Sequence, residues 1–440
     1  MTTESSALLT DLYQLTMVQA YVDHGLTDTA SFELFVRRLP AERNFLVAAG
    51  LEQVLGFLED FRFSEQELDW YARSRNAPPA FIDFLRALRF EGDVWAMPEG
   101  TLFFANEPIL RVTAPLPVAQ LVETRIINIL QYQTLIASKA VRCVLAAPGR
   151  LLVEFGLRRA HGAEAGLMAA RASYLAGFTG TSNVLAGMRF DIPLFGTMAH
   201  AFVQCHDREA DAFLDFARSH PDNVILLIDT YDTPAAARTV VEIAPVLKQE
   251  GIDIRGVRID SGDLLQRARE VRQILDEGGL NDTTLFSSGD LDEYRLTELL
   301  GQGAPIDGFG VGTRLDTSAD EPYLNCAYKL VEYAGRPRFK SSEGKATLPG
   351  RKQVFRVYQD GQAMRDIMTL HDRSCEGTPL LQPVMRAGRR LQAEPMSALR
   401  ERLKAQLDRL PPSLRTIEPA PPYPVEISEE IKQLLSRQTG

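Results

Sequence analysis

The residues best suited to chemistry lie where short apolar runs end in the middle of the chain. Arg258, Asp260 and Asp263 follow one such run in RIDSGDL, and strand alternation would put Arg258 and Asp260 on the same face. Charges clustered at the end of a buried strand are costly unless they are paired or engaged by a ligand. This stretch therefore favours a binding or catalytic role over a structural one.

A histidine and a pair of carboxylates could support proton or phosphoryl transfer. His200 closes FGTMAH, after an apolar run that ends in glycine, which suits proton transfer or nucleophilic attack on phosphorus. A structural histidine is the alternative. Asp229 and Asp232 lie three residues apart in IDTYDT and could bind a metal ion or a ribose. Asp232 could equally cap the helix that opens near Pro234.

Two further stretches suit an aromatic or anionic ligand. EFGLRR sets Phe155 beside Arg158 and Arg159, which offers a stacking ring next to forked cationic donors, although a core phenylalanine with surface arginines is the ordinary alternative. SSGD (287–290) and GFGVGTR (308–314) bring glycines whose backbone N–H groups could hold a phosphate. Their place after the last strand-like runs is the usual phosphate site of (β/α) barrels.

The elements that must position these residues alternate regularly from residue 150 onward. Each of six strand-like runs ends in glycine, aspartate or another polar group and, except for the last, precedes a segment compatible with a helix. The runs are RLLVEFG, IPLFG, VILLID, IRGVRID, TLFSSG and IDGFGVG. This alternation predicts a (β/α) barrel with its active site at the carboxyl ends of the strands; a doubly wound open sheet is the alternative.

The flanking segments predict a second domain of mixed structure. Residues 30–39 alternate like a strand, 45–61 and 81–90 have helical apolar spacing, and 92–115 is cut into short strands by Gly and Pro. Residues 117–147 predict a long helix that bridges two domains. The C-terminal third of the chain contains strand-like stretches followed by a charged helix, and we expect it to pack on the N-terminal segment.

Composition narrows the class of protein. The 440 residues are 45% hydrophobic and 24% charged, typical of globular proteins, and no stretch approaches a membrane span or a signal sequence, so we expect a cytoplasmic protein. The net charge of -10 argues against nonspecific nucleic-acid or membrane binding. The basic segment 336–356 is a local exception that would suit a polyanionic ligand or form a solvated hairpin. Four isolated cysteines are expected to be reduced: Cys143, Cys205, Cys326 and Cys375.

An ordered series of motifs over most of the chain resembles the nicotinate phosphoribosyltransferase family. The motifs are LLTDLYQLTM, EFGLRRA, GFTGTSNVLAG, FGTMAHAFV, IDTYDT, RIDSGDL, FGVGTRL and KSSEGKATLPGRKQV. The resemblance implies an irregular α/β barrel (129–329) joined to an α/β sandwich domain built from 1–128 and 330–440. It also implies transfer of a phosphoribosyl group to nicotinate, with release of pyrophosphate, coupled to ATP hydrolysis in a homodimer with shared active sites.

The resemblance assigns roles around the pyridine ring. Phe155 and Tyr13, the latter from the partner subunit, would sandwich the ring, and Arg258 would hold its carboxylate. Arg158 would serve the same pocket or the nucleotide phosphate. Ser182, in GFTGTSNVLAG, stands where nicotinamide-specific relatives carry an aspartate; a helix cap ahead of NVLAG is the alternative. Thr197 is also assigned to substrate binding.

The resemblance also assigns roles in catalysis and in phosphate binding. His200 matches the histidine that ATP phosphorylates, and Asp260 would face the ribose. Mg2+ is the expected cofactor and ATP the co-substrate, with no metal ligand assigned among the side chains. The residues expected to bind phosphate or pyrophosphate are Arg37, Ser288, Gly289, Gly310, Gly312, Thr313, Lys340 and Lys352.

Four competing functions make different demands on the sequence. Nicotinamide phosphoribosyltransferase would favour a carboxylate where this chain has Ser182, and quinolinate phosphoribosyltransferase has no counterpart to His200. A Schiff-base aldolase needs a lysine at a strand end, and none of the runs above supplies one. A non-catalytic nucleotide-binding barrel would predict loss of the His200 or Asp260 motif, and both are present.

Overall fold

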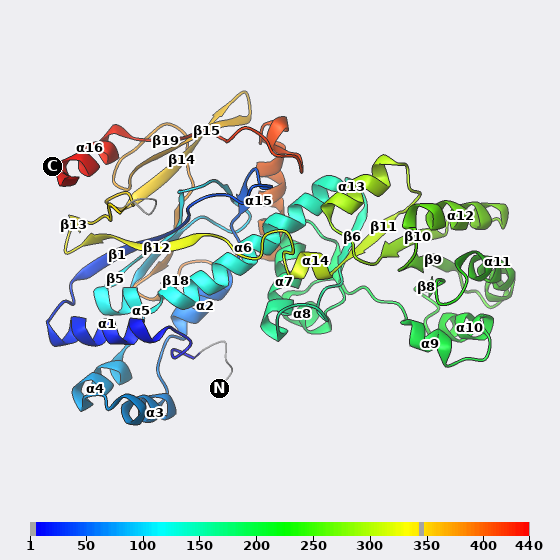
Figure 1. Ribbon diagram of the computed structural model, residues 1–440, viewed down its shortest axis with the longest axis horizontal. Helices are drawn as coiled ribbons and strands as arrows, with labels where there is room; N and C mark the ends of the chain where they lie inside the picture. Colours follow the sequence, from blue (N-terminus) through cyan, green and yellow to red (C-terminus); the bar gives the residue numbers. More distant parts are fainter. Residues whose placement is uncertain (1–5, 343–346, 440) are drawn as a thin grey trace. The chain divides into compact units, whose positions relative to one another are not determined.

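A computed structural model describes residues 6–342 and 347–439 (Figure 1). The chain divides into two compact units. The terminal unit contains Met1–Ser138 and Tyr323–Gly440, and the central unit contains Lys139–Pro322. In the part of the chain that the structure describes, no helix is long and apolar enough to cross a membrane.

The central unit is built on a six-stranded sheet in the order β7-β6-β11-β10-β9-β8, with every neighbouring pair parallel. The sheet curls into a half-barrel. Its strands are β6 (Leu151–Glu154), β7 (Gly180–Thr181), β8 (Val224–Leu227), β9 (Ile254–Ile259), β10 (Thr284–Ser288) and β11 (Gly308–Val311). Its helices are α7 (Ala163–Leu175), α8 (Val184–Phe190), α9 (His200–Gln204), α10 (Glu209–Ser219), α11 (Thr233–Gln249), α12 (Leu264–Glu277), α13 (Glu293–Gly301) and α14 (Thr313–Asp316).

Five of the six predicted strands are present, and the prediction of a strand at IPLFG is wrong. There only Leu194 forms an isolated bridge, to Thr181. Pro193 has no N–H to donate to a ladder, which limits pairing on this stretch. The sixth strand is instead β7. Its two residues lie in GFTGTS, a stretch with the composition of a turn, and are too few to show strand alternation.

Aspartates at the junctions between strands and helices fix where three of the helices begin. Asp232 caps α11 by accepting from Ala235 N at 2.8 Å, and Asp263 caps α12 by accepting from Leu265 N and Gln266 N at 3.1 and 3.2 Å. Asp292 likewise caps α13. The capping alternative for Asp232 is therefore confirmed, and Asp263 is also a helix cap.

The terminal unit combines N- and C-terminal segments in one seven-stranded sheet, in the order β13-β12-β1-β5-β3-β17-β18. β1 is antiparallel to both β12 and β5. The strands of this unit are β1 (Thr29–Val36), β2 (Leu46–Val47), β3 (Asp93–Ala96), β4 (Leu102–Phe103), β5 (Pro108–Pro115), β12 (Cys326–Tyr333), β13 (Arg336–Pro337), β14 (Lys352–Gln359), β15 (Gln362–Leu370), β16 (Thr378–Pro379), β17 (Gln382–Arg386), β18 (Arg389–Arg390) and β19 (Val425–Ile427).

Two helix predictions in this unit need correction. The segment 45–61 begins with β2, and its helix starts only at Leu51, because Gly50 has a left-handed backbone (φ 101°) that interrupts the helical path. The predicted helix 117–147 is two helices, α5 and α6, which part at Val122. The helices are α1 (Leu12–Asp23), α2 (Leu51–Glu59), α3 (Glu65–Arg75), α4 (Pro79–Ala87), α5 (Leu116–Leu121), α6 (Glu123–Ala146, which continues into the central unit), α15 (Met396–Asp408) and α16 (Glu429–Thr439).

Candidate active site

Strand register puts the predicted substrate residues on one face of the central sheet. Ser288 pairs with Gly310, and Gly310 pairs with Val153, two residues before Phe155. On the other side of β10, Phe286 pairs with Arg258. Because side chains alternate between faces along a strand, Arg258, Ser288 and Phe155 share a face, which we call the inner face. All three lie at or just beyond the carboxyl ends of their strands.

Arg258 is the centre of the polar contacts on the inner face. Its Nε donates to Ser288 Oγ at 2.9 Å, Nη1 donates to Thr197 Oγ1 at 3.2 Å, and Nη2 pairs with Asp260 Oδ1 at 3.2 Å. Ser288 Oγ also donates to Asp260. The structure thus joins four of the predicted site residues in one network. Arg258 Nη1 also donates to Met198 O at 3.4 Å, so one of the five guanidinium N–H groups remains for a ligand.

Phe155 lies beside this network and depends on a glycine for its place. Its ring centroid is 5.8 Å from the Arg258 guanidinium and 5.8 Å from the Phe286 ring. A Cβ added at Gly310 would lie 2.5 Å from Phe155 Cδ2, closer than such contacts occur. The absence of a side chain at Gly310 therefore leaves space for the Phe155 ring. This role is separate from any binding of phosphate by the loop that contains Gly310.

His200 begins α9 and is oriented by two residues at the end of β8. Its Nδ1 is 3.1 Å from Thr230 Oγ1, and its Nε2 is 4.0 Å from Asp229 Oδ1. Asp229 is buried, and its Oδ2 accepts from Asp260 N at 3.0 Å and from Ser261 Oγ at 2.5 Å. Its Oδ1 has no hydrogen-bond partner among the described residues. Asp229 therefore connects the histidine to the Asp260 loop.

The sequence offered Asp229 as a metal or ribose ligand, but the family resemblance assigned it no role in the site. Asp229 directly follows the apolar run VILLI, but the sequence alone does not distinguish its role from that of Asp232 three residues later, which is a helix cap. Only the folded chain separates the two carboxylates. One is turned to its own helix, and the other faces a histidine that lies 29 residues earlier.

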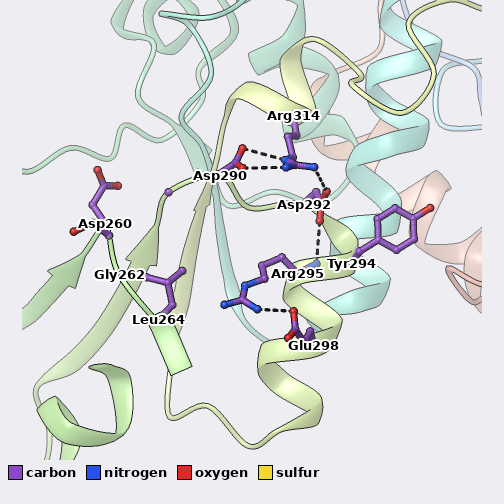
Figure 2. A pocket seen from close by; sticks show the side chains of 11 residues that line it. Asp260, Gly262, Leu264, Asp290, Asp292, Tyr294, Arg295, Glu298 and Arg314 are labelled. Atoms are coloured by element: carbon purple, nitrogen blue, oxygen red, sulfur yellow. Dashed lines mark hydrogen bonds and ion pairs between the residues drawn. The ribbon is translucent and has the colours of Figure 1, made fainter. Parts of the chain in front are cut away.

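An open cavity of about 690 Å3 is lined by the loop after β9, which includes Asp260, by Gly289 and the start of α13, and by Arg314. Figure 2 shows Arg314 held by Asp290, with both N–O distances 3.0 Å, and by Asp292 at 3.2 Å. The hydrogen bonds and charge of Asp290 raise the pKa of Arg314, and Arg314 lowers the pKa of Asp290. Arg314 therefore ties the two glycine loops together as a permanent cation.

The glycines of these loops are required by close backbone contacts. Gly289 has φ 101°, and a Cβ there would lie 2.2 Å from Asp260 O, while a Cβ at Gly312 would lie 2.7 Å from Phe155 O. Thr313 is exposed at the start of α14. These contacts bring the predicted phosphate loops against the Phe155 and Asp260 loops.

Ser182 follows β7 and is not a helix cap. The cap of α8 is Asn183, whose Oδ1 accepts from Ala186 N at 3.1 Å, so the capping alternative for Ser182 is wrong. Ser182 N donates to Glu154 O at 3.0 Å. Since Thr181 pairs with Glu154, alternation directs Ser182 and Phe155 to the same inner face. Arg158 lies exposed in the loop that follows Phe155.

Four predicted site residues lie in the terminal unit. Tyr13 on α1 is 50% exposed, and burial followed by the charge of Glu123 raises its pKa. Arg37 extends over the Phe35 ring at 5.4 Å, and Lys340 is exposed. The fourth is Lys352, which is buried.

Lys352 is engaged inside the terminal unit. Its Nζ is 2.7 Å from Glu33 Oε2 and donates to Leu348 O and Gly350 O at 3.0 and 2.8 Å. Burial lowers the pKa of Lys352, although Glu33 opposes that shift. Nearby Arg356 pairs with buried Asp366 in the same way. Much of the basic excess of 336–356 is thus balanced by carboxylates elsewhere in the chain; Lys345 lies outside the described residues.

Comparison with known families covers most of the chain. Residues 8–131 match the nicotinate phosphoribosyltransferase (NAPRTase) N-terminal domain, 151–354 match the NAPRTase family and 373–435 match the nicotinate phosphoribosyltransferase C-terminal domain. The chain is 48% identical to a nicotinate phosphoribosyltransferase of Mycobacterium tuberculosis over 98% of this chain and 93% of that protein. It is 43% identical to the enzyme of that name from Bacillus subtilis, over 84% and 77% of the two chains.

Solved structures agree with the sequence comparison. The human nicotinic acid phosphoribosyltransferase superposes with a TM-score of 0.88 at 30% identity, covering 98% of this chain and 99% of that one. A nicotinate-nucleotide pyrophosphorylase from Pyrococcus furiosus gives a TM-score of 0.76 at 25% identity, over 92% and 96%. The mixed α/β fold and the resemblance found in the motifs are both confirmed, and the chain belongs to the nicotinate phosphoribosyltransferase family.

Proposed function

We propose that this chain transfers the phosphoribosyl group of phosphoribosyl pyrophosphate to nicotinate, forming nicotinate mononucleotide and pyrophosphate in the salvage route to NAD. Family membership supports this enzyme class. The observation that carries the substrate assignment is Arg258 beside the Phe155 ring, 5.8 Å from its centroid. A stacking ring next to a forked cation is the arrangement that a flat aromatic carboxylate requires.

The direct test of this function is a pyrophosphate-release assay with phosphoribosyl pyrophosphate and Mg2+. Nicotinate, nicotinamide and quinolinate are offered separately, each with and without ATP. We expect release with nicotinate, stimulated by ATP, and at least a hundredfold lower kcat/KM with the other two. A preference for nicotinamide, or carbon dioxide release from quinolinate, would replace the proposal by the corresponding phosphoribosyltransferase.

We further propose that the central half-barrel is the irregular α/β barrel of the family, over 129–329. Segments 1–128 and 330–440 would then form its α/β sandwich domain. The pairing of β3 with β17 in one sheet supports the second assignment, because it needs both terminal segments. We propose cytoplasmic homodimers in which Tyr13 of the partner faces Phe155, and the exposure of Tyr13 supports this. Sedimentation that finds only monomers at assay concentrations would exclude shared sites.

ATP coupling is proposed to proceed through phosphorylation of His200. If Nε2 carries the imidazole proton and donates a hydrogen bond to Asp229, the lone pair on Nδ1 can attack the γ-phosphorus of ATP. An N–P bond forms, the bond between the γ-phosphorus and the bridging oxygen breaks, and ADP leaves. The 4.0 Å separation of Nε2 and Asp229 Oδ1 must shorten for that hydrogen bond, as catalytic contacts often do when ligands bind. Water later takes the phosphoryl group and restores the histidine.

The carboxylates near His200 fit the Mg2+ ion that we expect. Asp229 Oδ1 is buried without a hydrogen-bond partner among the described residues, and Asp260 lies on the neighbouring loop. Mg2+ is commonly held by one or two carboxylates together with substrate phosphates and water, so Asp229 and Asp260 would hold it. When bound, the ion would neutralise charge on the phosphates.

The residues of the chain divide the remaining work of the transfer. Displacement of pyrophosphate passes through a cationic ribosyl centre, so nicotinate must be held in line while the departing anion is stabilised. We propose that Asp260 orients the ribose, and that Ser288, Gly289, Gly310, Gly312 and Thr313 form the phosphate loops. Arg37 and Lys340 are proposed for pyrophosphate. Lys352 is better explained as the partner of Glu33.

Replacement of Gly310 by alanine is expected to raise the nicotinate KM at least tenfold. The added methyl group would meet the Phe155 ring at 2.5 Å and displace the stacking surface. Steady-state kinetics with nicotinate as the varied substrate measure the effect. Gly301→Ala is the matched control, because a Cβ at Gly301 meets nothing within 4 Å. An unchanged KM for Gly310→Ala would remove Phe155 from the nicotinate site.

A further inference from the structure

Two carboxyl groups meet on the face of the central sheet that lies opposite the proposed substrates. Glu154 ends β6 and Asp316 ends α14, and both side chains have no solvent exposure. The Asp316 carboxyl adjoins Gly156, whose N–H donates to a Glu154 carboxyl oxygen, so the two carboxyls are neighbours. A Cβ added at Gly156 would lie 2.2 Å from Asp316 Cγ, so the chain passes the pair with no room for a side chain. Neither group has been given a role in the reaction.

The contacts of Glu154 determine where the shared proton lies. Glu154 accepts hydrogen bonds from Gly156 N and from the Thr181 hydroxyl, which stabilise its ionised form. Two buried carboxyls in contact cannot both be ionised, so one proton is retained. We assign this proton to Asp316, from which it can form a hydrogen bond to Glu154. Burial and the charge of Glu154 raise the pKa of Asp316 well above its ordinary value.

The pair lies at the junction of three loops of the candidate site. Phe155, directly after Glu154, donates its N–H to Val311 O at 2.8 Å. Its carbonyl oxygen lies against Gly312, where a Cβ would be 2.7 Å away. Asp316 ends the short helix that follows this glycine loop, and Ser182 N donates to Glu154 O at 3.0 Å. A shift of either carboxyl would therefore move the stacking ring and the phosphate loop together.

We propose that Glu154 and Asp316 are a positioning pair that shares one proton and fixes the Phe155 ring relative to the phosphate loop 310–313. The inference rests on the proposed function for the identity of the two ligands. Because the pair faces away from the inner face, it acts on nicotinate and on phosphoribosyl pyrophosphate only through the loops. Loss of the pair should weaken the binding of both substrates.

The kinetic test compares two replacements of Asp316 in the full-length chain. Asp316→Ala leaves the Glu154 charge buried and unpaired, and we expect the KM of both substrates to rise at least tenfold. Asp316→Asn can donate to Glu154 without a shared proton, and we expect both KM values to stay within threefold of wild type. The control is Asp307→Ala, just before β11, which removes the carboxylate that accepts a hydrogen bond from Leu285 N of β10. It should lower stability and leave KM unchanged.

Two outcomes would overturn the positioning role. A merely structural role predicts that Asp316→Ala lowers the amount of active enzyme at unchanged KM. Equal damage from Asp316→Asn and Asp316→Ala would likewise show that the hydrogen bond to Glu154 is not what matters. If Asp316→Ala does not fold, Glu154→Gln replaces it, since its amide cannot accept from both Gly156 N and Thr181 and should raise both KM values.

A melting experiment tests the shared proton without any assay of activity. The folded chain keeps a proton on Asp316 that the unfolded chain has released above its ordinary pKa, so wild-type stability should fall as pH rises towards the raised pKa. Asp316→Asn removes this dependence, and its advantage in melting temperature over wild type should grow from pH 5 to pH 8. Parallel curves would exclude the shared proton even if the proposed substrates prove wrong. Both proteins keep the other charged groups on the elements packed here, Glu164 and Arg171 on α7 and Arg314 on α14.

Discussion

Replacement of His200 by alanine is expected to abolish the ATP hydrolysis that accompanies nicotinate mononucleotide formation. The imidazole is the proposed acceptor of the phosphoryl group, and alanine has no atom that can form the N–P bond. Phosphoribosyl transfer itself should continue slowly without ATP, because Arg258, Phe155 and the glycine loops remain. Parallel measurement of ADP and pyrophosphate release gives the ratio of the two reactions, which should fall from the wild-type value to the background level.

The matched control is His206→Ala. His206 lies just after α9, with Nδ1 2.8 Å from Phe202 O and Nε2 3.4 Å from Asp215, away from Asp229 and Thr230. The His206→Ala variant should retain ATP hydrolysis coupled to nicotinate mononucleotide formation. Acid-labile phosphate on the wild-type chain after exposure to [γ-32P]ATP, and its absence from the His200 variant, would identify the intermediate. Coupled hydrolysis at the wild-type ratio in His200→Ala would exclude phosphohistidine.

The strand–helix alternation was readable from sequence because each parallel strand is buried on both faces and appears as a short apolar run. The same rule hid β7, which has two residues, and misplaced a strand at IPLFG, where Pro193 cannot donate to a ladder. The apolar runs carry no information on how far the sheet closes. The half-barrel depends on the pairing order β7-β6-β11-β10-β9-β8, which is a property of long-range contacts.

The candidate site was predictable where neighbours in sequence are also neighbours in space. Arg258 and Asp260 needed only strand alternation, and the GFGVGTR glycines stood out by type. Roles set by distant partners were not predictable. Lys352 looked like an anion ligand until Glu33, 319 residues away along the chain, accounted for it. Asp229 and Asp232 differed only in which group each one faces.

Substrate choice is expected to depend on Ser182, and Ser182→Asp should lower kcat/KM for nicotinate at least a hundredfold. Register places Ser182 and Phe155 on the inner face, so a carboxylate at 182 would approach the nicotinate carboxylate. Two like charges about 4 Å apart repel by about 4 kcal/mol at an effective dielectric constant near 20. A hundredfold loss needs about 2.8 kcal/mol, so partial solvation still leaves the effect large.

The fold should not contribute to that loss, because Asn183 and not Ser182 caps α8, and Ser182 contributes its backbone N–H to Glu154 O. The melting temperature of Ser182→Asp should therefore stay close to that of wild type. Ser182→Asn is the neutral control of nearly the same size, and it should keep most of the nicotinate activity. Nicotinamide, whose amide can donate to the new carboxylate, should gain relative to nicotinate in Ser182→Asp alone. Equal kcat/KM values for nicotinate in the Asp and Asn variants would mean that charge at position 182 does not reach the substrate, and discrimination would then depend on Arg258.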